Sequence, residues 1–128
     1  MKIEHFAVNV ADPRALAQWY VANLGLRIAR ARTEPPYETF LADDNGETVI
    51  EVFNNPLGQH VNYGDMHPVT FHIAFTVDDM EAERERLIAA GATAFGEVAT
   101  TPTGDKLAFV RDPWGIAIQL VKRQTPLL

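Results

Sequence analysis

Cysteine is absent from the 128 residues, which excludes disulfides, thiolate metal sites and a cysteine nucleophile. Basic residues are in deficit, because 11 Lys and Arg stand against 17 Asp and Glu, for a net charge of −6. This balance argues against binding to nucleic acid or to an anionic membrane surface. A small molecule is therefore the expected partner.

Long apolar runs are also missing, since no stretch reaches the roughly 18 residues of a membrane-spanning helix. The segment from Met1 to His5 lacks the basic stretch and apolar block of a secretory signal. Both observations predict a cytoplasmic protein. A hydrophobic content of 47% is sufficient for one compact domain over residues 1–128.

What the chain does contain is an internal repeat. Residues 5–10 (HFAVNV) match residues 72–77 (HIAFTV) 67 positions later, with His, Ala and Val at the same places. The match resumes between 40–43 (FLAD) and 109–112 (FVRD). It continues between 49–52 (VIEV) and 117–120 (AIQL). These runs read as strands, and the turn sequences DNG and DPWG predict that each half closes with a β-hairpin.

A helix is expected after the first strand of each half. In the first half, Asp12 is a predicted N-cap, Pro13 occupies the first helical position, and Gly25 ends the helix. In the second half, Asp78 followed three residues later by Glu81 resembles a capping box with an aspartate cap. The predicted fold is therefore α+β, with two tandem βαβββ modules at 1–53 and 71–128. The connector, residues 54–70, is expected to cover a pocket.

The repeat aligns four polar residues in pairs, His5 with His72 and Glu51 with Gln119. Glu51 and Gln119 each interrupt an apolar run, where a buried polar group needs a partner. Taken singly, each of the four is more often a solvated or ordinary core residue. Their alignment by one duplication favours a shared site for one divalent metal ion, with nitrogen and oxygen ligands.

Several segments resemble the glyoxalase, bleomycin-resistance and extradiol-dioxygenase superfamily. They are Ile3-Glu4-His5, the helix with Trp19-Tyr20 and its Leu24-Gly25-Leu26 ending, Val49 to Val52, Phe71 to Phe75, and Phe109 to Gly115. The resemblance implies that the paired modules form a curved, half-open barrel around a metal-binding cleft. It also implies a homodimer whose sites are shared between chains.

By position in this family, His5, Glu51 and His72 match three metal ligands of bacterial glyoxalase I. Gln119 stands where that enzyme has a glutamate that binds metal and moves a proton. An amide oxygen can still bind Ni, Zn, Mn, Fe or Mg, but it cannot act as a base. The resemblance therefore favours a lyase or isomerase that chelates its substrate through two adjacent oxygens, with Glu51 as ligand and catalytic base.

Two other functions stay open. The first is a non-catalytic protein that binds a drug or metabolite in a cleft lined by aromatic residues, namely Trp19, Tyr37, Tyr63 and Trp114. The second is an Fe(II) extradiol dioxygenase, for which the family places a carboxylate where this chain has Gln119. In the connector, His60, Tyr63 and His67 could touch substrate, although exposed loop histidines are commoner. The cluster Arg27, Arg30 and Arg32 is interpreted as the wet face of a strand.

Overall fold

The computed structural model describes residues 1–127. The chain divides into two compact units, Met1–Val61 and Asn62–Leu128, and each is described by itself. The boundary between the units falls inside the predicted connector, residues 54–70.

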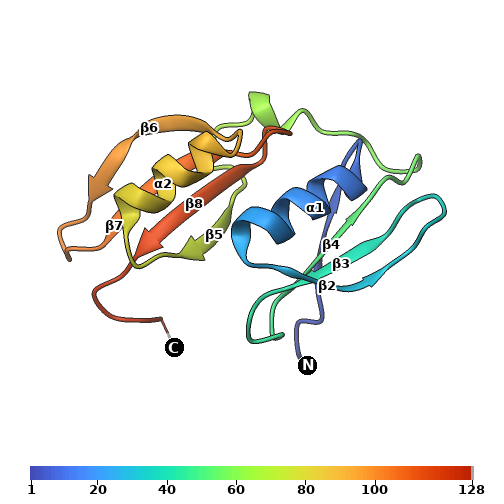
Figure 1. The fold of residues 1–128 in the computed structure, drawn as a ribbon, viewed down its shortest axis with the longest axis horizontal. Coiled ribbons are helices and arrows are strands. Elements are labelled where there is room, and N and C mark those ends of the chain that lie inside the picture. The colour runs from blue at the N-terminus through green and yellow to red at the C-terminus, as the bar shows by residue number, and fades with distance from the viewer. Residues whose placement is uncertain (128) are drawn as a thin grey trace. The chain divides into compact units, whose positions relative to one another are not determined.

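The first unit contains one helix and a four-stranded sheet (Figure 1). Its elements are β1 (Phe6–Asn9), α1 (Pro13–Leu24), β2 (Arg27–Ala31), β3 (Thr39–Ala42) and β4 (Val49–Phe53). The strand order is β1-β4-β3-β2, with β1 parallel to β4 and the remaining pairs antiparallel. The predicted hairpin at DNG is thus the β3–β4 connection.

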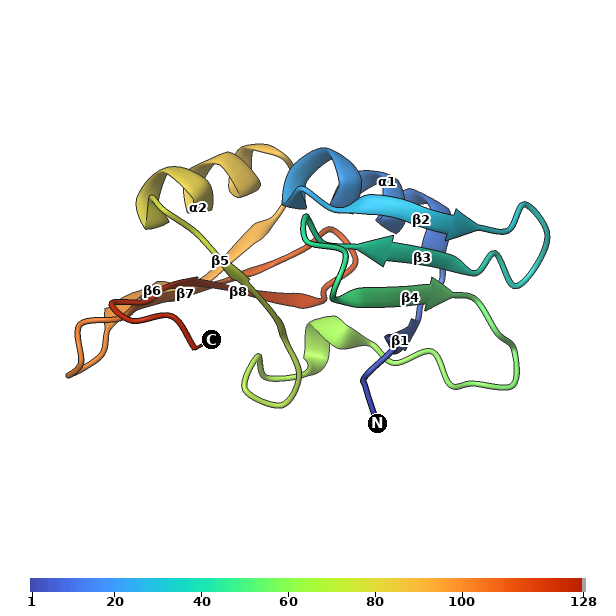
Figure 2. The same cartoon turned by 90° about the horizontal axis from the view of Figure 1, so that it is seen from below.

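Helix α1 covers one face of this sheet and leaves the other face open (Figure 2). Leu16 and Tyr20 of α1 are completely buried, as is Leu41 of β3. Along β4 the burial alternates, with Ile50 and Val52 buried between three half-buried residues. Because side chains alternate along a strand, the half-buried residues point to the open face. Glu51 is one of them.

The predicted ends of α1 are confirmed. The Asp12 carboxylate accepts a hydrogen bond from the backbone N–H of Ala15 at 3.0 Å, and Pro13 is the first helical residue. Gly25 ends the helix in the left-handed conformation, with φ at 70°, which glycine adopts without a steric penalty.

The second unit repeats this order after a short 3₁₀ turn. Its elements are η1 (Tyr63–Asp65), β5 (Ile73–Thr76), α2 (Met80–Ala89), β6 (Thr93–Thr100), β7 (Lys106–Arg111) and β8 (Ala117–Lys122). The strand order is β5-β8-β7-β6, again with one parallel pair, β5 with β8. The prediction of an α+β protein with two repeated βαβββ modules is confirmed.

The predicted cap of α2 is wrong by one residue. Asp79, and not Asp78, caps the helix, because its carboxylate accepts from the backbone N–H of Ala82 at 3.0 Å. Glu81 does not complete a capping box with Asp78. Its carboxylate instead accepts from Nζ of Lys106 on β7 at 2.8 Å, which lowers the pKa of Glu81.

The arginine cluster lies in and beside β2, at the edge of the first sheet. All five residues of β2 are exposed, so the interpretation of Arg27 and Arg30 as solvated is confirmed. Arg32 follows the strand and pairs with Glu38 at 3.3 Å (Nε to Oε2). The Arg30 guanidinium lies 5.0 Å from the centre of the Phe40 ring.

Candidate metal and substrate site

Two of the four aligned residues meet on the open face of the first sheet. His5 directly precedes β1, and Glu51 is the central residue of β4. Their side chains approach to 3.3 Å between His5 Nε2 and Glu51 Oε2, and only 14% of the Glu51 side chain is exposed. One module thus brings an imidazole and a carboxylate together on one face.

The second module repeats this arrangement position by position. Ala7 of β1 pairs with Glu51, and Ala74 of β5 pairs with Gln119 in the same parallel register. His72 directly precedes β5, as His5 precedes β1. The side chains aligned by the sequence repeat therefore occupy equivalent positions in the two sheets.

An aromatic ring accompanies each histidine. Phe40 pairs across the strands with Glu51, and Phe109 pairs with Gln119. The rings of His5 and Phe40 meet edge to face with centroids 5.6 Å apart. Those of His72 and Phe109 do the same at 5.4 Å. The duplication thus preserves a three-residue unit of His, Phe and an oxygen-bearing side chain.

Both histidines are oriented through Nδ1. His72 Nδ1 lies 2.8 Å from the backbone carbonyl oxygen of Pro68, and because this oxygen can only accept, Nδ1 carries the hydrogen. His5 Nδ1 contacts the Glu4 carboxylate in the same manner. In the neutral form of each ring the lone pair is then on Nε2, the nitrogen that would bind a metal. Carboxylates and backbone carbonyls often orient metal-binding histidines in this way.

The geometry within the first module fits a metal ion. Two nitrogen or oxygen ligands of a tetrahedral zinc ion are about 3.4 Å apart, close to the His5–Glu51 separation of 3.3 Å. Among residues 1–127, no three or more His, Cys, Asp and Glu side chains are grouped so as to hold a metal. Each unit supplies one histidine and one oxygen donor, which is half of the predicted set.

The surroundings of Glu51 favour its protonated form. Burial raises the pKa of Glu51, His5 opposes this, and the nearby Glu38 carboxyl raises the pKa further. The hydrogen bond to Glu4 raises the pKa of His5, against the effect of burial. A base works best when its pKa lies near the working pH, and this shift moves Glu51 in that direction.

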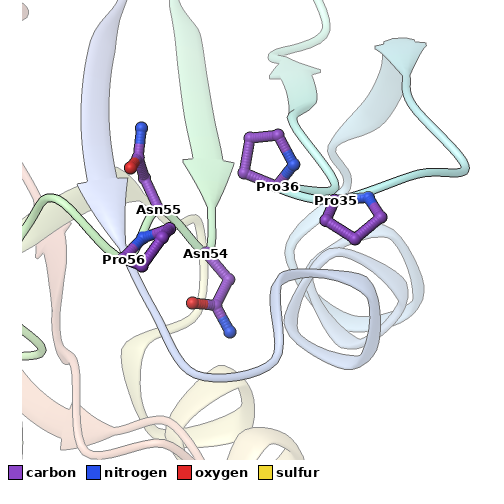
Figure 3. A pocket seen from close by; sticks show the side chains of 5 residues that line it. All are labelled: Pro35, Pro36, Asn54, Asn55 and Pro56. Carbon is purple, nitrogen blue, oxygen red and sulfur yellow. The ribbon is translucent and has the colours of Figure 1, made fainter.

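A pocket of about 340 Å³ opens beside Glu51. It is lined by Pro36, Glu38, Glu51, Phe53 and Asn55. A second pocket of about 220 Å³ is lined by Pro35, Pro36, Asn54, Asn55 and Pro56 (Figure 3). The start of the connector therefore does line a pocket, as expected.

The two aromatic residues of the first module proposed to bind substrate do not line these pockets. Trp19 is half-buried on α1, the helix that covers the face of the sheet opposite to Glu51. Tyr37 has a positive φ of 58°, and its ring lies 4.4 Å below the Arg14 guanidinium. The structure thus does not bring Trp19 or Tyr37 together with His5 and Glu51.

The other two aromatic residues lie in the second unit. The Tyr63 ring packs against Phe71 with centroids 5.9 Å apart, and burial raises the pKa of Tyr63. Trp114 lies in the β7–β8 turn, where its backbone N–H donates to Asp112 at 2.9 Å. Arg111 holds the neighbouring 3₁₀ turn by donating to the carbonyl oxygens of Tyr63 and Met66.

The connector histidines are exposed. His60 Nε2 lies 3.0 Å from Oδ1 of Asn54, and the His67 ring meets Phe95 edge to face at 5.4 Å. Neither residue lines the pocket beside Glu51.

Glu38 is the site residue that the sequence reasoning missed. It precedes β3 and is two residues from Phe40, the partner of Glu51 in the β3–β4 ladder. Since side chains alternate along a strand, Glu38 shares the face of Phe40 and Glu51. The hairpin register was the signal that could have found it.

Comparison with known proteins shows the family of this chain. The family model of the Glyoxalase/Bleomycin resistance protein/Dioxygenase superfamily matches residues 2–120. The chain belongs to this superfamily. Lactoylglutathione lyase from Salmonella typhimurium is 30% identical over 95% of this chain and 93% of its own length. Lactoylglutathione lyase from Haemophilus influenzae is 29% identical over 98% of this chain and 95% of its own length.

Solved structures show the same fold. A glyoxalase family protein from Bacillus cereus has a TM-score of 0.78 at 20% identity, with 95% of this chain and 93% of that chain covered. A glyoxalase I mutant from Zea mays has a TM-score of 0.74 at 23% identity, with 97% of this chain and 46% of that chain covered. No helix within residues 1–127 is long and apolar enough to cross a membrane.

Proposed function

We propose that this glyoxalase-superfamily protein is a metal-dependent lyase or isomerase for a small substrate chelated through two adjacent oxygens. The observation that carries the proposal is the repeated unit of His5, Phe40 and Glu51 in one module and His72, Phe109 and Gln119 in the other. The similarity to lactoylglutathione lyases supports a glyoxalase-like reaction.

In this proposal His5 and His72 hold one divalent ion through Nε2, Glu51 through a carboxylate oxygen and Gln119 through its amide oxygen. Nickel, zinc, manganese, iron or magnesium would suit such nitrogen and oxygen donors. When bound, the ion polarises the two substrate oxygens and so acidifies the carbon next to the carbonyl.

Glu51 is the proposed base. It takes the proton from the carbon next to the substrate carbonyl and returns it to the neighbouring carbonyl carbon, so the reaction is an isomerisation without loss of atoms. The small exposed fraction of Glu51 supports this role, because the proton that it takes is held away from water. Gln119 has no ionisable oxygen, so its proposed role is only to bind the metal ion.

The presence of Gln119 in place of a carboxylate weakens the extradiol dioxygenase alternative. That chemistry uses two histidines and one carboxylate around Fe(II), and in this family the carboxylate lies at the position of Gln119. A protein that binds a metabolite without catalysis is the remaining alternative, and the experiment below separates it from an enzyme.

The test is turnover of 2-oxoaldehyde hemithioacetals by protein loaded with each metal, comparing wild type with Glu51→Gln and Glu47→Gln. Glu47 is an exposed residue of the β3–β4 turn and serves as the control. We expect Glu51→Gln to keep one bound metal per site and lose turnover by about a thousandfold, since its amide coordinates but accepts no proton. Full activity in Glu51→Gln would refute the mechanism, and stoichiometric ligand binding without turnover in wild type would identify a binding protein.

We further propose that the protein works in the cytoplasm as a homodimer with sites shared between chains. The proposal rests on the family resemblance. Light scattering of the metal-loaded protein tests it, since a monomer that retained full activity would contradict shared sites.

A further inference from the structure

The pocket beside Glu51 is a groove lined by Pro36, Glu38, Glu51, Phe53 and Asn55. The second pocket shares Pro36 and Asn55 with this groove. Any part of a substrate that extends from Glu51 over Glu38 and Phe53 enters the groove.

The charged groups that line the groove are all acidic. Its walls are Pro36, Phe53, Asn55 and the carboxyl groups of Glu38 and Glu51. When Glu51 binds a metal, the cation neutralises the Glu51 carboxylate, and Glu38 remains as the charged group of the groove. A carboxylate on the substrate would find no cationic partner among these lining residues.

The nearby arginines compensate Glu38 only weakly. Arg32 pairs with Glu38 at 3.3 Å, but 67% of its side chain is exposed and it does not line either pocket. Exposed ion pairs of this kind are screened by water and salt. Arg30 lies over the Phe40 ring.

Backbone and side-chain hydrogen bonds fix the shape of the groove. Oδ1 of Asn9 on β1 accepts a hydrogen bond from the backbone N–H of Asn55 at 2.8 Å. Nδ2 of Asn9 donates to the Asn55 carbonyl oxygen at 3.1 Å. The backbone N–H of Asn54 donates to the Pro36 carbonyl oxygen at 2.8 Å. These bonds join the 35–38 and 54–56 segments, so the groove is preorganised and binding costs little ordering entropy.

We propose that this groove binds the part of the substrate beyond its two chelating oxygens, and that Glu38 selects a tail that carries an amine and no carboxylate. This inference rests on the proposed function and names its substrate class. The glutathione named in the similar lyases carries two carboxylates, which this groove disfavours. Glu38 is thus a specificity-determining residue, and Pro36, Phe53 and Asn55 form the walls.

The first experiment compares kcat/KM for methylglyoxal hemithioacetals of 2-(dimethylamino)ethanethiol, mercaptoethanol and glutathione with metal-loaded protein. The tails are cationic, neutral and anionic respectively. We expect wild type to prefer the dimethylamino adduct, Glu38→Gln to reduce this preference, and Glu38→Lys to reduce it by about tenfold or more. The matched control Glu47→Lys makes the same charge change in the β3–β4 turn and should leave the preference unchanged.

A second measurement does not depend on turnover. S-methylcysteamine and S-methylglutathione carry a cationic and an anionic tail without the chelating oxygens, and their dissociation constants can be measured by calorimetry or NMR titration. We expect wild type to bind S-methylcysteamine more tightly, and the conservative variant Glu38→Gln to lose most of the difference. Folding of each variant is checked by thermal unfolding.

The outcomes separate the two ideas. Absence of turnover with all three adducts would refute the proposed function, while the binding comparison would still decide the inference about the groove. Wild type favouring the glutathione compounds, or Glu38→Lys keeping the wild-type preference, would overturn the role of Glu38 even if the protein is an active isomerase.

Discussion

Single carboxylates hold the two hairpin turns that follow β3 and β7. Asp112 is 3% exposed, and its Oδ1 accepts from the backbone N–H groups of Trp114 and Ile116. Asp43 at the equivalent turn accepts from those of Glu47 and Thr48 but is only half-buried. The assignment of both aspartates to turn chemistry is confirmed.

Replacing each aspartate by alanine should show that the buried turn loses more free energy of unfolding than the half-buried turn. We expect Asp112→Ala to lower the free energy of unfolding by about 3 kcal/mol, because it leaves a buried N–H without a partner, and Asp43→Ala by about 1 kcal/mol. Urea denaturation measures both values. Equal losses would show that burial of the acceptor does not decide the cost.

Asp43 also predicts a pH dependence. Although burial acts in the opposite direction, backbone hydrogen bonds from Thr48, Glu47 and Gly46 lower the pKa of Asp43 below its ordinary value. The ionised form therefore stabilises the fold fully above the unfolded pKa of about 3.9, and this contribution is lost as pH falls through the lower folded value. Below about pH 4 the stability of wild type should fall more steeply than that of Asp43→Asn. Equal slopes of the free energy of unfolding against pH for wild type and Asp43→Asn would contradict this.

At the level of helices, the capping of α2 offers a matched pair of variants. Asp79→Ala removes the acceptor for Ala82 N–H and should cost about 1 kcal/mol of stability. Asp78→Ala removes a neighbouring exposed carboxylate and leaves the Asp78 carbonyl that accepts from Lys122, so its cost should be a few tenths of a kcal/mol. Urea unfolding followed by circular dichroism compares them, and a larger loss for Asp78→Ala would restore the original prediction.

The two helices show what local sequence can predict. Asp12, Pro13 and Gly25 act through neighbours in the chain, so α1 could be placed from sequence. The cap of α2 was misplaced because two aspartates are adjacent and because Glu81 pairs with Lys106 on a distant strand. The groove could not be predicted for a similar reason, since hydrogen bonds between distant loops create it.

Across the whole chain, the duplication predicts the paired site residues but hides how the modules differ. His5 and Phe40 keep their counterparts His72 and Phe109. The acids do not. Glu51 corresponds to Gln119. Glu38 corresponds to Leu107, because the register places Glu38 opposite Phe53 in the first hairpin and Leu107 opposite Val121 in the second. The acidic chemistry is thus confined to the first module.

The proposed metal site takes ligands from both modules, which predicts a linkage between metal and stability. If one ion takes ligands from both modules, saturating metal at about a hundred times the dissociation constant should stabilise the wild type by about 2.7 kcal/mol. Neither His5→Ala nor His72→Ala should gain that stabilisation, although each change leaves the other module intact. Urea unfolding of chelator-treated protein, with and without added nickel or zinc, measures the effect.

His60→Ala is the control for this linkage, because His60 is an exposed histidine that contacts Asn54 and is absent from the proposed ligand set. It should be stabilised by metal as wild type is. Full stabilisation of His72→Ala would mean that the ion needs only His5 and Glu51 of the first module. A complete loss in both histidine variants, with none in His60→Ala, requires that the two halves of the repeat bind the same ion, because a ligand stabilises the folded chain only through groups that contact it.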